Sequence, residues 1–320
     1  MLDADRRRLA VVLLGYGGPR DLDEVEAFLS RVMAPRRPSA EAVRSAQERY
    51  RLIGGGSPLV ANSRAQAAAL EQELERRLSE TPGLLGAQTE TRVFLGMRSS
   101  EPFLEEAVRE AADWGGRLRF AVLASHGSEG ATGAYRERVA VVLGDGYDLA
   151  QAFVSGWHLA AGYLEAVADR IESARADAGL PETAPVLFTA HSLPFRDGQE
   201  EDQVYRTRLE QTVALLAEKL RAVEVRLAFQ SAAPRPGVRW MGPFAESVLE
   251  ELAAAGHTGV VVAPLGFVSE HLETLYDLDI ALKERARELG VRFARANTVG
   301  THPRFIAALA EAVLAGPEEN

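Results

Sequence analysis

The chain has 320 residues and a net charge of −10, from 36 Lys and Arg against 46 Asp and Glu. Hydrophobic residues make up 47% of it and charged residues 26%, which are ordinary globular values that exclude disordered and low-complexity classes. An acidic chain lacks the basic surface of general nucleic-acid binding, so we expect no nucleic-acid partner. The absence of cysteine excludes disulfides, thiol catalysis and a cysteine-ligated iron–sulfur cluster.

No apolar run approaches the ~20 residues that a membrane-spanning helix needs. Three arginines, Arg6–Arg8, precede the apolar stretch Leu9–Leu14. That stretch is shorter than the ~7–15 residues of a signal-peptide core, and no small-residue cleavage site follows it. We therefore interpret it as a first buried strand and expect a cytoplasmic protein with no integral membrane segment.

Short β-rich apolar runs alternate with longer helical patterns along the chain. The runs predict strands at Leu9–Leu14, Thr91–Leu95, Leu118–Ala124, Tyr147–Val154, Pro185–Ala190, Val223–Phe229, Gly259–Ala263 and Val291–Ala294. Helices are predicted at Asp21–Met33, Ala40–Arg51, Asn62–Ser79, Glu101–Trp114, Thr132–Leu143, His158–Ala178, Glu201–Arg221, Phe244–Ala254, Glu270–Leu289 and Arg304–Leu314. Most strands are continuously apolar, which is typical of parallel strands covered on both faces.

This alternation predicts an α/β fold with two similar doubly wound parallel-sheet domains. The eight strands divide four and four near residue 150, which indicates one domain over 1–150 and a second over 151–320. Ligands of open α/β sheets bind at the carboxyl ends of the strands. Polar, aromatic and small residues follow the strands of both halves, so we expect one active cleft between the domains.

His191 follows an apolar strand and precedes a turn that Pro194 fixes. At a strand end, a neutral imidazole can accept a proton or bind a divalent metal ion. Position alone slightly favours the alternative, a histidine that is hydrogen-bonded within its own turn.

Three carboxylates follow the strand Gly259–Ala263. On a helix, Glu270, Glu273 and Asp277 are spaced i, i+3 and i+7 and would share one face. Like charges on one face repel unless a cation or solvent relieves them, so the pattern predicts a route for a divalent cation or for protons. A solvated acidic face near a helix N-terminus is the alternative, and it suffices for Glu270 but not for Asp277.

The loop after the second helical pattern contains three consecutive glycines, Gly54–Gly56. It follows a helix and lacks a Gly-Lys-Ser/Thr sequence, so it is neither a dinucleotide-binding loop nor a P-loop. A simple connection between two helices explains it when it is taken alone. Arg49, Arg51 and Ser57 would nevertheless suit the carboxylate groups of a ligand.

Basic and aromatic residues near the same segments suit a flat, anionic ligand. Arg31, Arg36 and Arg37 cluster together, although a solvated basic loop explains at least one of them. Flat ligands favour aromatic linings, and scattered core packing would give the same pattern. The aromatic residues near the strand ends are Tyr16, Phe195, Trp240 and Phe267.

Four blocks together resemble the ferrochelatase family, chelatases that insert iron into a porphyrin. The blocks are Leu14–Pro19, Tyr50–Leu59, Thr189–Pro194 and Phe267–Asp279. Each block is weak to moderate alone, but their order and separations are specific. The resemblance extends from about Val11 to Leu314 and implies a chelatase-like fold.

The resemblance implies that His191 is the catalytic imidazole and Glu273 its carboxylate partner across the cleft. Tyr16 matches the cleft tyrosine of the soluble Gram-positive type. Other residues match positions near the porphyrin propionates of that type: Arg49, Ser57 and Tyr135. The expected metal route is His191, Glu270, Glu273 and Asp277. The expected substrate-binding residues are Tyr16, Arg31, Arg49, Ser57, Arg98, Tyr135, Trp240 and Phe267.

Four positions depart from the family pattern. Gly127 replaces the usual aromatic residue after His126. Arg98 and Ser99 stand where some relatives have a lysine–histidine pair, which puts an outer metal contact in doubt. Ala281 stands where the acidic line of the helix often continues for one more turn.

The resemblance implies insertion of Fe²⁺, as a substrate, into a porphyrin in haem biosynthesis, with no organic cofactor. We expect coproporphyrin III, because four propionates need the local arginines, although these arginines would also suit a surface loop. The alternatives are a protoporphyrin IX ferrochelatase, a cobalt or nickel tetrapyrrole chelatase, and a non-catalytic haem- or tetrapyrrole-binding protein. The presence of both His191 and Glu273 favours catalysis, because a binder needs one axial ligand. A haem-pathway enzyme or an iron donor is a further expected partner.

Overall fold

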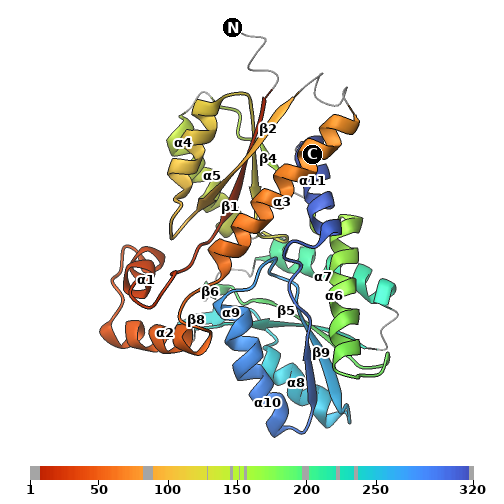
Figure 1. Ribbon diagram of the computed structural model, residues 1–320. Coiled ribbons are helices and arrows are strands. Elements are labelled where there is room, and N and C mark those ends of the chain that lie inside the picture. Colours follow the sequence, from red (N-terminus) through yellow and green to blue (C-terminus); the bar gives the residue numbers. More distant parts are fainter. Residues whose placement is uncertain are drawn as a thin grey trace. The chain divides into compact units, whose positions relative to one another are not determined.

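The computed structural model (Figure 1) describes residues 8–81, 89–127, 129–144, 147–150, 152–154, 157–196, 202–220, 224–233 and 237–316. The chain forms two compact units, Met1–Gly162 with Thr301–Asn320, and Tyr163–Gly300. This division differs from the boundary expected near residue 150, because the first unit extends to Gly162 and also includes the end of the chain.

The first unit contains a parallel sheet of four strands. They are β1 (Arg8–Gly15), β2 (Glu90–Met97), β3 (Arg117–Val122) and β4 (Phe153–Val154), in the order β2-β1-β3-β4. Of the strand predicted over 147–154, only these last two residues form a strand in the described part of the chain. All residues from Leu9 to Leu14 are buried, as expected for a strand with helices on both faces.

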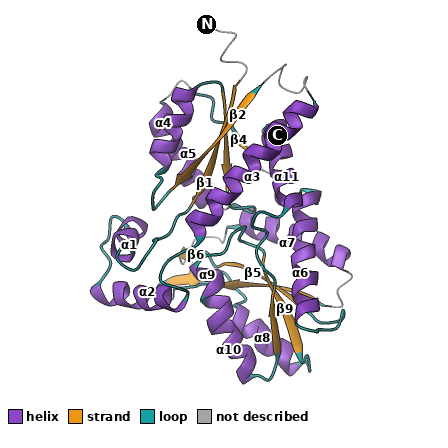
Figure 2. Ribbon diagram, in the orientation of Figure 1, coloured by secondary structure: helices purple, strands orange, loops and turns teal. Residues whose placement is uncertain are grey.

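Helices cover both faces of this sheet (Figure 2). Ala10, Val12 and Leu14 of β1 pack into a core with α4 and α5. The residues between them point to the opposite face of the sheet, where α3 lies. The helices of this unit are α1 (Val25–Met33), α2 (Ala40–Leu52), α3 (Leu59–Glu80), α4 (Leu104–Trp114), α5 (Glu129–Leu143), the 3₁₀ turn η2 (Trp157–Leu159) and α11 (Pro303–Ala315).

The last helix belongs to the first unit because of its packing. α11 contacts α3, and the ring of Phe305 lies 5.6 Å from that of Trp157. Gly162 also lies close to this helix, since a Cβ atom added to it would be 2.5 Å from the carbonyl oxygen of Arg304. The sequence pattern could not indicate this return of the chain, because it depends on contacts between segments far apart in sequence.

The second unit contains its own parallel sheet. Its strands are β5 (Val186–His191), β7 (Val225–Gln230), β9 (Gly259–Pro264) and β10 (Arg292–Arg295), in the order β10-β9-β5-β7. Numbered within each unit in chain order, both sheets have the strand order 2-1-3-4. The prediction of an α/β fold with two similar parallel sheets is confirmed.

Helices also flank the second sheet. Leu187 and Val262 form a core with residues of α8, η3 and α10, whereas Phe188 and Ala263 are buried on the other face. The helices are α6 (Ala161–Asp177), α7 (Gln203–Leu220), α8 (Ala245–Ala254), α9 (Leu272–Leu275), the π-helical segment η3 (Asp277–Leu282) and α10 (Lys283–Glu288).

Two features of the second unit differ from expectation. β6 (Pro194–Arg196) and β8 (Val238–Trp240) form an antiparallel ribbon that the sequence did not indicate, because three-residue strands carry too little pattern. The prediction of a single helix over 270–289 is wrong. Helix α9 starts only at Leu272, and the hydrogen-bond ladder widens where Ile280 and Ala281 both donate to the carbonyl oxygen of Tyr276.

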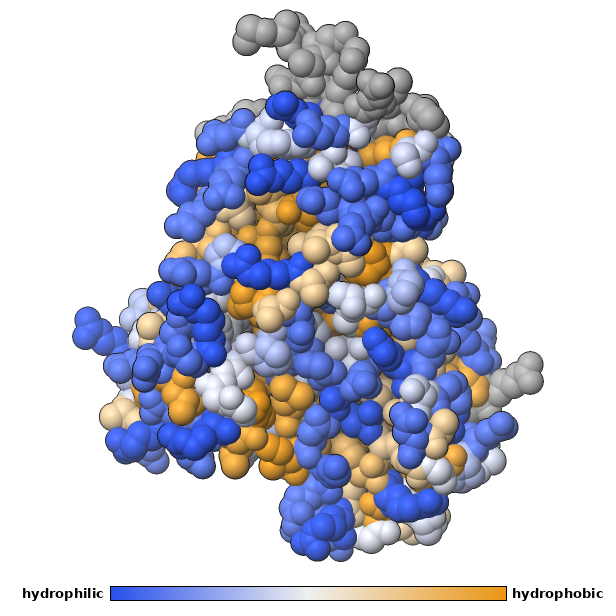
Figure 3. Space-filling model, viewed as in Figure 1, coloured by the Kyte–Doolittle hydropathy of each residue, from blue (hydrophilic) through white to orange (hydrophobic). Residues whose placement is uncertain are grey.

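In the described part of the chain, no helix combines the length and apolarity that a membrane span requires. Hydrophilic side chains cover much of the face shown in Figure 3, and apolar side chains form smaller patches among them. This surface agrees with the charged-residue content of 26%.

Candidate functional site

His191 is the last residue of β5, at the carboxyl end of the second sheet. In both sheets the strand order changes direction between the first and the third strand, which in the second sheet are β5 and β9. Such switch points form natural ligand sites in open α/β folds. The position of His191 is fixed by its pairing with Gln230 of β7 and by Tyr205, whose hydroxyl donates to the His191 carbonyl oxygen at 3.2 Å.

His191 and Glu273 form a direct side-chain pair. The Nδ1 atom of His191 lies 2.9 Å from Oε2 of Glu273, and the two side chains are 35% and 30% exposed. Because a carboxylate accepts, Nδ1 donates, and the neutral imidazole therefore carries its lone pair on Nε2. The pair thus presents a solvent-accessible nitrogen that can take a proton or contact a metal ion.

Burial lowers the pKa of His191, but the charge and hydrogen bond of Glu273, together with the charge of Asp277, outweigh burial. The pKa of His191 therefore lies above its ordinary 6.5. Burial raises the pKa of Glu273, and the proximity of His191 and His271 reverses this, so that the pKa lies well below 4.5. At a pH between these two pKa values, His191 is an imidazolium and Glu273 a carboxylate. The neutral, proton-accepting imidazole forms when the pH rises above the raised pKa of His191.

Asp277 lies at the start of η3 and is bound by the turn after β7. The Oγ atom of Ser231 donates to Oδ2 of Asp277 at 2.5 Å. Ser231 has a φ of 63°, a left-handed conformation that costs a non-glycine residue on the order of 1–3 kcal/mol. Beside it, Nε2 of Gln230 donates to the backbone oxygen of Glu273 at 2.7 Å.

Glu270 lies before α9, in a partly buried ion-pair cluster. Its Oε1 atom accepts from Nη1 of Arg295 and from the backbone N–H of Thr298, both at 2.8 Å. The Nε atom of Arg295 donates to Oδ1 of Asp279 at 2.6 Å, and the Arg295 side chain is only 11% exposed. The expectation of three carboxylates along one helix face is therefore wrong, because the helix begins after Glu270 and Arg295 binds this carboxylate.

His271 is a site residue that the sequence analysis missed. Its Nδ1 atom lies 3.1 Å from the carbonyl oxygen of Ser269, which can only accept, so neutral His271 carries its lone pair on Nε2. That Nε2 lies 3.9 Å from Oε2 of Glu273. Its ring contacts Phe267, with centroids 4.5 Å apart. The one available signal was its place two residues before Glu273.

Over the residues that the structure describes, no three His, Asp or Glu side chains are grouped so that they could hold a metal ion. The expected metal residues are instead distributed: His191 pairs with Glu273, Asp277 with Ser231, and Glu270 with Arg295.

In the first unit, Tyr16, Arg98 and Tyr135 come together. Tyr16 follows β1 and is 43% exposed, the Arg98 guanidinium lies 5.8 Å from its ring centroid, and Phe28 packs against it edge-on at 6.3 Å. Tyr135 is only 4% exposed, and burial raises the pKa of its hydroxyl despite the opposing charge of Arg98. A guanidinium and two phenols thus lie near the switch point of the first sheet.

The turn after Tyr16 brings Ser57 into this neighbourhood. Gly17 has a φ of 90°, and a Cβ atom on Gly18 would lie 2.6 Å from that of Ser57. Only glycine fits there. The backbone N–H of Gly18 also donates to Oγ of Ser100 at 3.2 Å.

The other expected substrate residues lie on neighbouring or separate elements. Arg31 is near the end of α1, with its guanidinium 5.1 Å from the centroid of Phe103. Arg49 lies in the last turn of α2. Trp240 belongs to the second unit, at the end of β8, where it pairs in register with Pro194.

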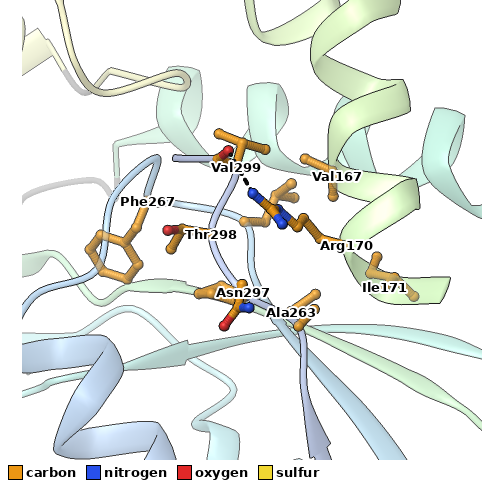
Figure 4. Close-up of a pocket in the computed structure, with 11 residues that line it drawn as sticks. Val167, Arg170, Ile171, Ala263, Phe267, Asn297, Thr298 and Val299 are labelled. Carbon is orange, nitrogen blue, oxygen red and sulfur yellow. Dashed lines mark hydrogen bonds between the residues drawn. The ribbon is translucent and has the colours of Figure 1, made fainter. Parts of the chain in front are cut away.

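A small pocket of about 10 Å³ lies between α6 and the loops after β9 and β10 (Figure 4). Phe267 forms one wall, and Nη2 of Arg170 donates to the Val299 carbonyl oxygen at 3.4 Å. Small-molecule sites usually measure ~300–1,000 Å³. This pocket is too small for a ligand of that size, and Arg170 instead connects α6 to the loop after β10.

Comparison with known proteins decides the family. A profile of the Ferrochelatase family matches residues 8–316. The chain belongs to the ferrochelatase family. It is therefore a lyase-class metal chelatase of haem biosynthesis, as the four sequence blocks predicted.

Relatives with two different names are similar over nearly the whole chain. The Coproporphyrin III ferrochelatase of Frankia alni is 37% identical, covering 95% of this chain and 79% of that protein. The Coproporphyrin III ferrochelatase of Geobacillus kaustophilus is 32% identical, covering 97% of this chain and 96% of that protein. The Ferrochelatase of Synechocystis is 34% identical, covering 96% of this chain and 82% of that protein.

Solved chelatase structures share the fold of this ferrochelatase. SirB from Bacillus subtilis with Fe³⁺ aligns with a TM-score of 0.52 at 18% identity, covering 96% of this chain and 94% of that one. CbiX, the terminal enzyme of sirohaem biosynthesis in denitrifying bacteria, aligns with a TM-score of 0.52 at 15% identity, covering 96% and 98%. The predicted chelatase-like fold is confirmed.

Proposed function

We propose that this ferrochelatase inserts Fe²⁺ into coproporphyrin III, with His191 as the proton acceptor and Glu273 as its partner. The observation that carries this proposal is the 2.9 Å contact between Nδ1 of His191 and Oε2 of Glu273, at a strand end that remains partly open to solvent. A carboxylate that orients an imidazole is a recurrent arrangement for proton transfer at a fixed atom.

The reaction removes two N–H protons from the porphyrin and places one Fe²⁺ in the ring. In our proposal, Nε2 of His191 accepts the two pyrrole protons one after the other and releases the first to solvent before it takes the second. Glu273 stabilises the imidazolium that forms each time. Because the pKa of His191 lies above 6.5, its protonated form is favoured, which supports proton uptake more than proton return. Solvent access at His191 and Glu273 then allows the proton to leave.

Asp277 and His271 extend this centre along η3 and the loop before α9. The charge of Asp277 acts on His191, and Nε2 of His271 faces Glu273 at 3.9 Å. Carboxylates and neutral imidazoles both accept Fe²⁺ as ligands, so they suit a cation that is passed on rather than retained. Glu270 has no part in this proposal, because Arg295 already binds it.

The substrate assignment rests on the first unit. Arg31, Arg49 and Arg98 bring three cations to a chain of net charge −10, and Ser57 and Tyr135 add hydroxyl donors. Guanidinium groups bind carboxylates through charge-assisted hydrogen bonds. Coproporphyrin III carries four propionates and protoporphyrin IX two, so the former gains more from these donors. The names of the relatives from Frankia and Geobacillus support the same substrate.

The test is anaerobic addition of Fe²⁺ to the protein with each porphyrin, measured as loss of free-base fluorescence. We expect kcat/KM to be at least about tenfold higher for coproporphyrin III, which corresponds to ~1.4 kcal/mol of differential stabilisation. A tenfold preference for protoporphyrin IX would overturn the substrate and leave the chelatase assignment intact. Tight porphyrin binding without fluorescence loss would instead favour a binding protein.

A further inference from the structure

The turn after β7 contains the one left-handed non-glycine residue in the described ranges. Ser231 has a φ of 63°, a conformation that glycine and asparagine adopt far more readily than serine. A residue held there against its preference marks a backbone that its surroundings fix. At this position the Oγ atom of Ser231 donates to Oδ2 of Asp277 at 2.5 Å, although the two residues are 46 positions apart.

A buried amide completes a chain of hydrogen bonds at this turn. Gln230 is 3% exposed, and its Nε2 donates to the backbone oxygen of Glu273 at 2.7 Å and to Oγ of Ser231 at 3.4 Å. Because Ser231 accepts from Gln230, its own proton points to Asp277. Through Ser231, the Gln230 amide thus connects the backbone oxygen of Glu273 to the carboxylate of Asp277.

This chain of contacts lies beside the catalytic pair. Gln230 is the register partner of His191 in the sheet, so the turn begins at the strand end that carries the imidazole. Asp277 is the first residue of η3, and an aspartate side chain there has several rotamers. A hydrogen bond from a rigid turn selects one of them.

We propose that Ser231 is a positioning residue that orients the Asp277 carboxylate for delivery of Fe²⁺ to the His191–Glu273 pair. The inference rests on the proposed function, because it takes Asp277 as part of the iron route. Ser231 acts through Asp277 and does not itself touch the porphyrin. Its left-handed backbone is the means by which its hydroxyl reaches η3.

Three substitutions distinguish the effect of the Ser231 hydroxyl from the effect of its left-handed backbone. Ser231→Gly removes the hydroxyl and suits the left-handed backbone, and Ser231→Ala removes the hydroxyl without relieving the backbone. Ser231→Asn suits the backbone and supplies an amide donor. Ser173→Ala is the matched control, since exposed Ser173 donates to Asp177 at 3.5 Å on α6. Each variant is also combined with Asp277→Asn.

Two measurements apply to every variant. The first is steady-state Fe²⁺ insertion with separate KM values for Fe²⁺ and for coproporphyrin III. The second is titration with Co²⁺ alone, without porphyrin, followed by visible absorbance. We expect Ser231→Gly and Ser231→Ala to raise the KM for Fe²⁺ and the Kd for Co²⁺ by roughly tenfold, as for one lost hydrogen bond to a charged group. The porphyrin KM and kcat should stay within about twofold, and Ser231→Asn should recover part of the loss.

In the Asp277→Asn background, removal of the hydroxyl should have no further effect on either constant. Three results would overturn the proposal. The first is that Ser231→Gly has the same KM for Fe²⁺ and Kd for Co²⁺ as the unsubstituted protein. The others are that removal of the hydroxyl has its full effect in the Asp277→Asn background, or that only the porphyrin KM changes. If the unsubstituted protein inserts no iron, the proposed function fails, but the Co²⁺ titration still decides the role of Ser231. An unchanged Kd in Ser231→Gly would then contradict it.

Discussion

The two units of the molecule share a strand order and differ in the chemistry at their switch points. In the first unit, Tyr16 follows β1, Arg98 follows β2, and Tyr135 lies on α5 after β3. Ser57 lies close to the turn after Tyr16. In the second sheet, the ends of β5, β7 and β9 lead to imidazoles and carboxylates around His191. In our proposal, one scaffold serves two tasks, anion binding in the first unit and proton and metal transfer in the second. Substitutions in one unit should therefore change constants that substitutions in the other leave unaltered.

The largest expected effect is on stability in the second unit. Arg295→Met leaves Glu270 and Asp279 without their partly buried cation, and breaking such a cluster costs up to about 3–5 kcal/mol. Arg292→Met, on the exposed side of the same strand, is the control. Urea unfolding followed by circular dichroism measures the difference. A loss under 1 kcal/mol, about the value of an exposed ion pair, would show that this cluster does not hold the start of α9.

His191→Ala should have the largest effect on chemistry. We expect turnover to fall by at least ~10²-fold, since a positioned acid–base group typically contributes this much. Porphyrin affinity should persist, because the residues that we propose for anion binding belong to the first unit. His257→Ala is the matched control, since His257 lies 2.9 Å from Glu224 in a pair on the same unit. Fluorescence titration measures binding and fluorescence loss measures turnover; near-normal turnover would remove His191 from the mechanism.

Glu273→Gln should reduce turnover by roughly tenfold or more, and Asp277→Asn by less. The first substitution removes the charge that stabilises protonated His191, whereas the second removes a charge that acts from further away. Glu224→Gln tests the corresponding change in the His257–Glu224 pair, which is similarly exposed. Equal, mild losses for Glu273→Gln and Asp277→Asn would indicate a solvated acidic surface with no role in transfer.

The smallest expected effect sharpens the role of the first unit. Arg98→Met removes the cation beside Tyr16, so the KM for coproporphyrin III should rise by roughly fivefold, equivalent to ~1 kcal/mol, with kcat unchanged. Arg8→Met is the control, because Arg8 lies over Trp114 at 5.2 Å in the same unit. A fall in kcat at constant KM would contradict the division of tasks.

The sequence predicted the two sheets because their strands are continuously apolar and alternate with long helical patterns. It predicted His191 and Glu273 through family blocks, since neither residue type has a specific spacing of its own. Glu270 was misinterpreted because its environment depends on Arg295, a partner 25 residues away. Ser231 carries no local signal, because nothing in a Gln-Ser dipeptide indicates a left-handed backbone. Contacts between distant segments decided each of these positions.

The pH dependence of single-turnover iron insertion tests the central claim most directly. The claim requires neutral His191, and its raised pKa means that the neutral form is lost as the pH falls through a value above 6.5. With coproporphyrin III already bound, the rate of fluorescence loss should therefore rise with pH to a midpoint above 6.5, and Glu273→Gln should move that midpoint lower. A rate that stays constant across this range, or a midpoint that Glu273→Gln leaves in place, would contradict the account.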